Sequence, residues 1–234
     1  PAQPAGRFVD SADALQSSTG GFTSFGLDPT RGQLLELQIQ IPTIEERIHQ
    51  GGTTGYVIIA LGIVAALLSL ERFTTLTIMG SKVNAQTKSA TPSDGNPLGR
   101  VLKVYAENKE VDPETLQLKL DEAILKEQPA INARIAFIKI ISMVAPLLGL
   151  LGTVTGMIVT FQAITLFGTG DPKTMAGGIS QALMTTVLGL CVAIPTVLLH
   201  SIVQSRSSTV LHILTEQSAG LIAEHAENAE KAGK

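Results

Sequence analysis

Four threonines inside charge-free segments are the residues of this chain whose type and spacing could support chemistry. Thr153 and Thr160 lie seven residues apart, which places both on one face of a helix. Thr185 and Thr186 belong to a second apolar segment. Such hydroxyls could line a polar pore in an oligomer, or they could join helices through hydrogen bonds. Because a membrane threonine often bonds only its own helix, the residues alone leave both interpretations open.

No pattern indicates an enzyme or a metal centre. The four histidines are too scattered for metal ligation, and the one cysteine, Cys191, lies in an apolar run. Residues 168–174 superficially resemble a phosphate-binding loop, but Pro172 stands where the final glycine must be. There is no basic run that would indicate nucleic-acid binding. We therefore expect no catalytic residues, no metal, no cofactor and no nucleic-acid partner.

The charge-poor composition indicates a membrane protein. Hydrophobic residues make up 44% of the 234 residues and charged residues only 16%, against about 25% in soluble domains. Three stretches carry no Asp, Glu, Lys or Arg: 51–70, 140–170 and 174–205. About 20 such residues are enough for a helix to cross the hydrocarbon core of a bilayer. The sequence therefore predicts an all-α membrane protein with three transmembrane helices.

The second and third predicted spans contain no charged side chain in their interiors. A charge at the bilayer centre costs at least about 3 kcal/mol and usually marks an ion pathway. If protons cross the membrane here, a partner must therefore supply the carboxylate that carries them. His200 is the titratable side chain of the third span, and its place near the end of that span favours an interfacial role.

The distribution of basic residues predicts the orientation. The segment between the first two spans holds nine Lys and Arg residues, whereas the loop between the second and third spans carries only Lys173. By the positive-inside rule the large segment and the C-terminus are cytoplasmic, and the N-terminus is periplasmic. The nine residues are Lys82, Lys88, Arg100, Lys103, Lys109, Lys119, Lys126, Arg134 and Lys139.

The N-terminal region has a different composition from the spans. Residues 1–32 are rich in Ser, Gly, Thr and Ala, which predicts an irregular periplasmic remnant, and the start at Pro1 indicates a processed or truncated chain. Residues 33–52 form a periplasmic or interfacial amphipathic segment, with a capping box at 43–46. The predicted segments that follow are the first span 53–79, a cytoplasmic helical domain 80–138, the second span 139–167, a periplasmic loop 168–177, the third span 178–204 and a cytoplasmic helical tail 205–234.

The cytoplasmic segment is predicted to be helical. Asn96 and Asp112 each precede a proline, as an N-cap precedes the first helical position. An apolar stripe then continues into the second span, so we expect one long helix, kinked at Pro129. The third span also continues beyond His200 with apolar spacing. Two of the spans therefore extend into a cytoplasmic helical bundle. The stripe consists of Leu116, Leu120, Ile124, Ile131, Ile135 and Ile138.

Small residues recur at helical spacing in the second and third spans. Gly152 and Gly156 form a GxxxG step, and Gly149 and Thr153 repeat the spacing. Small residues let the backbones of membrane helices approach closely. We therefore expect close helix packing at Gly149, Gly152, Gly156, Gly189 and Pro195.

Residues 145–200 resemble the MotA/TolQ/ExbB proton-channel family. The resemblance rests on APLLGLLGTV at 145–154, GISQAL at 178–183, TTVLGL at 185–190 and AIP at 193–195, in that order and spacing. It extends more loosely to the first span, and it is most like long ExbB variants that carry an extra periplasmic region. The family often has Glu where this chain has Gln181, so a proton role for that residue does not carry over. Hydrogen bonding between helices is the favoured interpretation of Gln181.

The resemblance implies a homo-pentamer in the bacterial (Gram-negative) inner membrane. Two copies of a single-span ExbD-like subunit would stand in its pore, with an Asp that takes up and releases protons. Thr153 and Thr186 match the family's pore-facing threonines, and Thr160 and Thr185 are candidates for the same pathway. With a TonB-like protein the complex would energise uptake across the outer membrane. The alternatives are a TolQ-like subunit of an envelope-integrity motor and a passive scaffold for its partners.

Overall fold

The computed structural model describes residues 6–24, 44–89, 91–168 and 172–232, and the regular elements among them are all helices. The predicted all-α class is therefore confirmed. In chain order the helices are α1 (Gly6–Ser17), α3 (Ile44–Gln50), α4 (Gly52–Gln86), α5 (Pro97–Glu107), α6 (Pro113–Asn132), α7 (Ile135–Phe167) and α8 (Pro172–Ala232).

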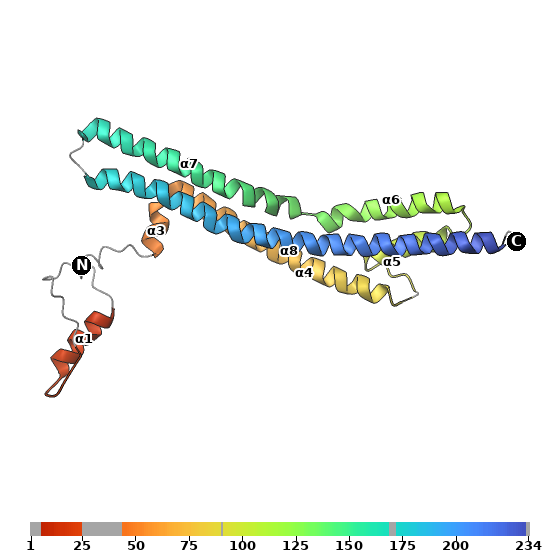
Figure 1. Ribbon diagram of the computed structural model, residues 1–234, viewed down its shortest axis with the longest axis horizontal. Coiled ribbons are helices and arrows are strands. Elements are labelled where there is room, and N and C mark those ends of the chain that lie inside the picture. Colours follow the sequence, from red (N-terminus) through yellow and green to blue (C-terminus); the bar gives the residue numbers. More distant parts are fainter. Residues whose placement is uncertain (1–5, 25–43, 90, 169–171, 233–234) are drawn as a thin grey trace.

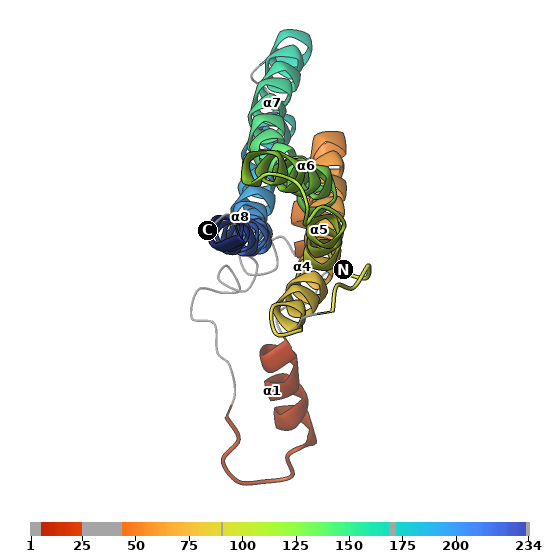
Figure 2. The ribbon, with the colours of Figure 1, turned by 90° about the vertical axis from the view of Figure 1, so that its right-hand side faces the viewer.

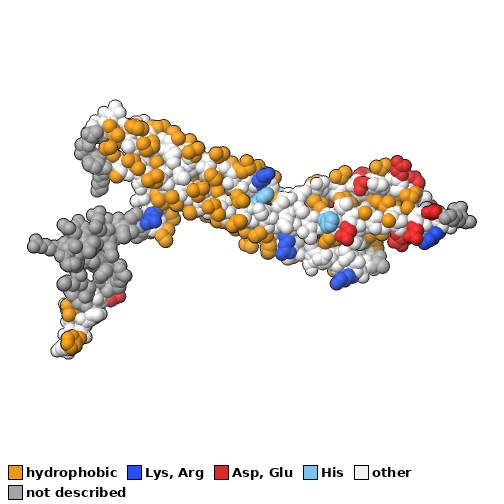
Figure 3. Space-filling view, viewed as in Figure 1, with side chains coloured by type: hydrophobic (Ala, Val, Ile, Leu, Met, Phe, Trp, Pro, Cys, Tyr) orange, Lys and Arg blue, Asp and Glu red, His pale blue; other side chains and the backbone are white. Residues whose placement is uncertain are grey.

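Three long helices, α4, α7 and α8, lie side by side (Figure 1). Each contains an apolar stretch long enough to cross a membrane, as the charge-free runs predict. Figure 3 shows that hydrophobic side chains cover the part of these helices nearest the α7–α8 connection, and that acidic side chains gather at the opposite end. The outward apolar side chains include Leu67 of α4, Leu147 of α7 and Leu198 of α8, each more than half exposed. A surface of this kind fits a lipid environment and not water.

The charged end of the molecule is a helical bundle with its own apolar core, seen end-on in Figure 2. We call this part the helical extension; it comprises residues 80–132 of α4 to α6 and residues 203–232 of α8. Leu116, Leu120 and Ile131 of the predicted stripe are buried in its core, and Ile124 packs against it. Val83 of α4 and Leu214 of α8 are buried there too, so α4 also contributes to the bundle beyond its predicted end at residue 79.

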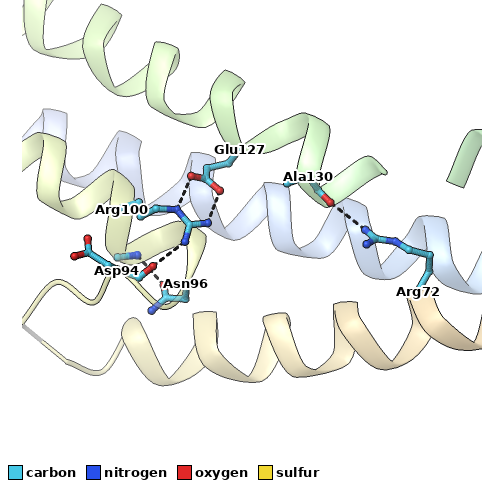
Figure 4. Close-up of polar contacts among 7 residues, drawn as sticks. Arg72, Asp94, Asn96, Arg100, Glu127 and Ala130 are labelled. Atoms are coloured by element: carbon cyan, nitrogen blue, oxygen red, sulfur yellow. Dashed lines mark hydrogen bonds and ion pairs between the residues drawn. The ribbon is translucent and has the colours of Figure 1, made fainter. Parts of the chain in front are cut away.

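Both predicted N-caps are confirmed. The Asn96 side chain accepts a hydrogen bond of 2.7 Å from the Gly99 backbone N–H, and Asp112 accepts one of 2.8 Å from that of Thr115. Arg100 of α5 reaches across to α6, where its Nε and Nη2 donate to the two carboxylate oxygens of Glu127 (Figure 4). These contacts fix the ends of α5 and α6 and the angle between them.

Two predictions of local structure are wrong. The stripe does not run on one helix into the second span: α6 ends at Asn132, and α7 begins at Ile135 after Arg134 with φ 62°. A left-handed residue costs roughly 1–2 kcal/mol and ends a right-handed helix. The N-terminal region is not wholly irregular, because residues Gly6–Ser17 form α1. Its Ala and Leu residues favour a helix, and the Ser and Gly content of the region conceals them. Thr43, the first residue of the predicted capping box, lies outside the described residues.

Candidate functional site

The contact between α7 and α8 contains most of the predicted site residues, and its glycines stand where the two backbones approach most closely. A Cβ added to Gly189 would lie 2.8 Å from the Ala145 carbonyl oxygen, and one on Gly149 would lie 3.0 Å from that of Thr185. A Cβ on Gly156 would lie 2.8 Å from the Gly178 carbonyl oxygen. Any side chain here would push the helices apart, because backbone atoms have nowhere to move. We call this region the small-residue contact (Gly149, Gly152, Gly156, Gly178, Ala182 and Gly189).

Thr160 and Thr185 lie inside the small-residue contact. Thr185 is 0% exposed and Thr160 is 3% exposed. The Thr185 hydroxyl donates to the Ala182 carbonyl at 2.9 Å and lies 3.3 Å from the Gly149 carbonyl of α7. The Thr160 hydroxyl donates to the Gly156 carbonyl at 3.0 Å. This placement supports a packing role for both threonines and does not support the pore-lining role expected from the sequence.

Thr153 and Thr186 lie at the edge of the small-residue contact, each half-buried. Successive residues of a helix are rotated by about 100° about its axis. Thr153 follows Gly152, and Thr186 follows Thr185, so each of the two threonines is rotated in the same direction away from the centre of the contact. Because α7 and α8 run antiparallel, this places both threonines on the same side of the helix pair. The Thr153 hydroxyl donates to the Leu150 carbonyl at 2.6 Å. The Thr186 hydroxyl is buried and has no hydrogen-bond partner among the described residues.

Gln181 and Pro195 face α4 and not α7. The Gln181 amide lies against Gly52 at the start of α4, where a Cβ would meet its Nε2 at 2.7 Å. Next to it, the Ser180 hydroxyl donates to Gln50 at 3.1 Å. Pro195 lines an apolar hollow of about 300 Å³ between α4 and α8, with Gly62 and Val192 among its other walls. Both residues therefore touch the first span within one chain.

A cluster of charges at the break between α6 and α7 is absent from the sequence-based site. Arg72 of α4 is 5% exposed, and its Nη2 donates to the carbonyls of Ala130 at 3.2 Å and Ile131 at 2.5 Å (Figure 4). Its neighbour Glu71 pairs with Arg134 at 2.7 Å. We call this cluster the joint (Glu71, Arg72, Arg134 and residues 130–133). The sequence contains one signal for this cluster: an acidic and a basic residue, Glu71 and Arg72, directly follow the uncharged run of 20 residues at 51–70.

The described residues contain no group of three or more His, Cys, Asp or Glu side chains placed to hold a metal ion. The polar groups of the small-residue contact are hydroxyls and backbone carbonyls, which neither gain nor lose protons at ordinary pH. They can orient water or accept and donate hydrogen bonds to a neighbouring polar group. The chemistry open to this site is therefore hydrogen bonding to a group that another molecule brings.

The sequence of this chain is similar to those of known proteins. The sequence profile of the MotA/TolQ/ExbB proton channel family matches residues 93–216. An ExbB homolog from Methanothermobacter thermautotrophicus, described as a biopolymer transport protein, is 30% identical over 180 residues, which are 70% of this chain and 64% of the relative. An ExbB-like biopolymer transport protein of Synechocystis is 29% identical over 187 residues, 72% of this chain and 74% of the relative.

A second kind of relative matches a shorter region. The Tol-Pal system protein TolQ of Pseudomonas aeruginosa is 32% identical over 89 residues, which are 38% of this chain and 38% of TolQ. The chain thus spans less than two thirds of the Methanothermobacter relative and a smaller part of TolQ. Three membrane-length apolar helices and a matched profile over more than half of the residues define a class of membrane channel subunits. The chain belongs to the MotA/TolQ/ExbB proton channel family.

Proposed function

We propose that this chain is the multi-span, ExbB-like subunit of a proton-driven motor in the inner membrane of a Gram-negative bacterium. Five copies surround a pore, and two copies of a single-span, ExbD-like subunit stand inside it. A TonB-like protein carries the resulting work to outer-membrane uptake. The helical extension and the C-terminus are cytoplasmic in this arrangement, because the nine basic residues between the first two spans belong on that side.

The observation that carries this proposal is the pair of hydroxyls on one edge of the small-residue contact. The Thr186 hydroxyl is buried without a partner in the described chain, and a polar group of this kind normally has one. Thr153 lies on the same side of the helix pair. Since residues 140–170 and 174–205 hold no acid, a proton-carrying carboxylate must come from another subunit. A carboxylate facing this edge would accept the Thr186 hydrogen bond.

The test removes these two hydroxyls and keeps the side-chain volume. We expect the Thr153→Val, Thr186→Val double variant to assemble normally but to lose most partner-dependent proton uptake, since valine cannot bond a carboxylate or water. Proteoliposomes that hold the chain with its single-span partner, and a pH-sensitive dye inside, measure the flux. Thr165→Val is the matched control, because Thr165 is exposed on α7 and bonds only its own helix. Full flux in the double variant would refute the pore assignment.

The same vesicles separate the motor from a passive scaffold. A scaffold gives no proton flux with or without the partner, whereas the motor gives flux only when both subunits are present. The sequence similarity to TolQ of Pseudomonas aeruginosa supports a second candidate, an envelope-integrity motor. Deletion of the gene distinguishes the two systems: loss of siderophore or haem uptake indicates the TonB-type role, and sensitivity to detergent with normal uptake indicates the TolQ-type role.

A further inference from the structure

The joint lies where the sequence predicts one continuous helix from the helical extension into the second span. Ala133 has ψ 140° and Arg134 has φ 62°, so two consecutive residues leave the helical conformation. The apolar side chains on both sides keep their places, because Ile131, Ile135 and Ile138 are all buried. The chain therefore changes direction without losing its core. Something other than the apolar stripe must hold the two helix ends in their relative positions.

First, α4 binds the end of α6. A helix that stops leaves its last carbonyls without intrahelical donors. Arg72 supplies a donor to two of them, those of Ala130 and Ile131. Arg72 is 5% exposed beside an apolar span, where a guanidinium needs acceptors, so its Nη2 group and these two carbonyls satisfy each other. Figure 4 shows the Arg72 side chain pointing from α4 to the end of α6.

Second, α4 also binds the start of α7. The Glu71 carboxylate accepts from Arg134, the left-handed residue itself, at 2.7 Å. On the other side of the break, Ser207 of α8 is 0% exposed and donates to the Asn132 side chain at 2.6 Å. Glu71 and Arg72, adjacent in α4, therefore bind both sides of the break, and Ser207 of α8 also binds the α6 side.

Third, the bonding at the joint is incomplete. The second carboxylate oxygen of Glu71 and the Nε of Arg72 are both buried, and neither has a hydrogen-bond partner among the described residues. Native structures leave few such atoms, and each has a reason. Arg72 itself is buried, whereas the Glu71 and Arg134 side chains are 41% and 55% exposed and have room to move. One spare acceptor and one spare donor, next to two occupied ones, give these groups the capacity for a different set of hydrogen bonds.

We propose that Glu71 and Arg72 are positioning residues of the motor: they set the angle between the membrane spans and the helical extension, and they let that angle change in steps. Because α6 and α7 are separate helices, motion of the spans reaches α6 through its bonds to α4 and α8. The part of this proposal that concerns motion during proton flow rests on the function proposed above. The part that concerns the angle does not.

The test measures the angle directly in the assembled complex. Spin labels at Gln117 of α6 and Lys139 of α7, both exposed, report the distance across the joint in a Cys191→Ser background. Labelled chains are diluted with unlabelled ones so that each complex carries one labelled copy. We expect a single narrow distance in the parent and a distribution at least twofold wider in Arg72→Gln. Arg72→Lys, which keeps one donor, should lie between them.

Two further variants separate charge from backbone conformation. Arg134→Gly keeps the left-handed conformation and removes the pair with Glu71, so it should widen the distribution as Glu71→Gln does. Glu122→Gln is the matched control, because Glu122 pairs only with Lys126 on the surface of the same helix. An unchanged width in Arg72→Gln would overturn the proposal. If that variant does not assemble, an unchanged width in both Glu71→Gln and Arg134→Gly overturns it.

The readouts also keep this proposal separate from the proposed function. Spin-label distances do not depend on proton flux. A wider distance distribution in Arg72→Gln, in a complex that carries no protons, would therefore support the positioning role and refute only the proposed motor function. Conversely, Arg72→Gln could show a wider distance distribution together with normal proton flux and transport. That result would mean that transport does not depend on the angle, and it would overturn the part of the proposal that concerns motion during proton flow.

Discussion

The small-residue contact lies along α7 and the joint lies just before its start, yet different forces stabilise them. At the small-residue contact, α7 and α8 touch through glycine backbones, and the buried hydroxyls of Thr160 and Thr185 bond nearby carbonyls. At the joint, a buried arginine and a carboxylate link three helices, and two of their polar atoms remain unpaired. The first region has one way to pack, because backbone atoms cannot yield. The second is held by side chains that can exchange partners.

The two regions therefore differ in rigidity. Close backbone packing transmits displacement without loss, because a well-packed interior has low compressibility. At the joint, the Glu71 and Arg134 side chains are partly exposed and two polar atoms are unpaired, so the contacts there can adjust. The small-residue contact is thus the rigid region, and the joint is the adjustable one. The two regions should therefore respond differently to substitution.

The largest effect is expected at the small-residue contact. Gly152→Leu places a side chain into Thr185, and the helices must separate because the neighbouring atoms are rigidly held. We expect a loss of about 3 kcal/mol and little intact complex. Complex size in detergent, followed during heating, measures it. Gly177→Leu is the control, since a Cβ there meets nothing within 4 Å. Equal stability of the two variants would contradict the close-packing argument.

At the joint we expect a smaller loss of stability. Arg72→Ala leaves two helix-end carbonyls of α6 without their donor, which should cost about 2–3 kcal/mol. Lys103→Ala is the comparison, because both side chains of the Lys103–Asp94 pair are exposed and such pairs contribute about 1 kcal/mol or less. Thermal unfolding followed by circular dichroism measures both. A smaller loss for Arg72 than for Lys103 would mean that the joint does not depend on its buried charge.

The third effect separates the buried threonines from those at the edge. Thr185→Val removes a hydroxyl that bonds a carbonyl inside the small-residue contact, so we expect a loss of about 1 kcal/mol of stability. Thr186→Val removes a hydroxyl that has no partner in the described chain, so stability should stay the same or rise slightly. The same heating assay compares them. If the two variants lose equal stability, the distinction between a packing threonine and a pore threonine fails.

The smallest effect is expected in the helical extension, at the start of α6. The hydrogen bond from the Thr115 backbone N–H holds the pKa of Asp112 below its usual value of 3.8. A carboxyl with a lowered folded-state pKa stabilises the helix above that usual value and loses the effect as the pH falls through the folded one. Asp112→Ala lacks the cap at every pH. Its deficit in Thr115 amide protection should therefore shrink below pH 3.8, as hydrogen exchange can measure.

The sequence was sufficient for those features that depend on local pattern. Uncharged runs predict the three spans, and a polar residue before proline predicts the caps at Asn96 and Asp112. The glycine spacing predicts which face of α7 packs closely, although the partner helix comes only from the structure.

The joint could not be predicted because its cause is not local. Ile131, Ile135 and Ile138 keep a helical spacing across the break, so the apolar period continues where the helix does not. The left-handed Arg134 is held by Glu71, which lies 63 positions earlier in the chain. The burial of Thr160 and Thr185 between α7 and α8 could not be predicted for a related reason. Hydroxyls that line a pore and hydroxyls between two helices have the same sequence spacing, and only the position of the neighbouring helix distinguishes them.

One consequence follows from the length of α8. It continues without a break for 61 residues, which is about 90 Å, and it carries Thr186 near one end and the core of the helical extension near the other. In a rigid helix of this length, a small tilt at one end produces a large displacement at the other. A tilt of about 5° around Thr186 would move the far end sideways by several ångströms, more than the rise of about 1.5 Å per helical residue. A small tilt of α8 in the membrane would thereby be enlarged into a displacement of the helical extension.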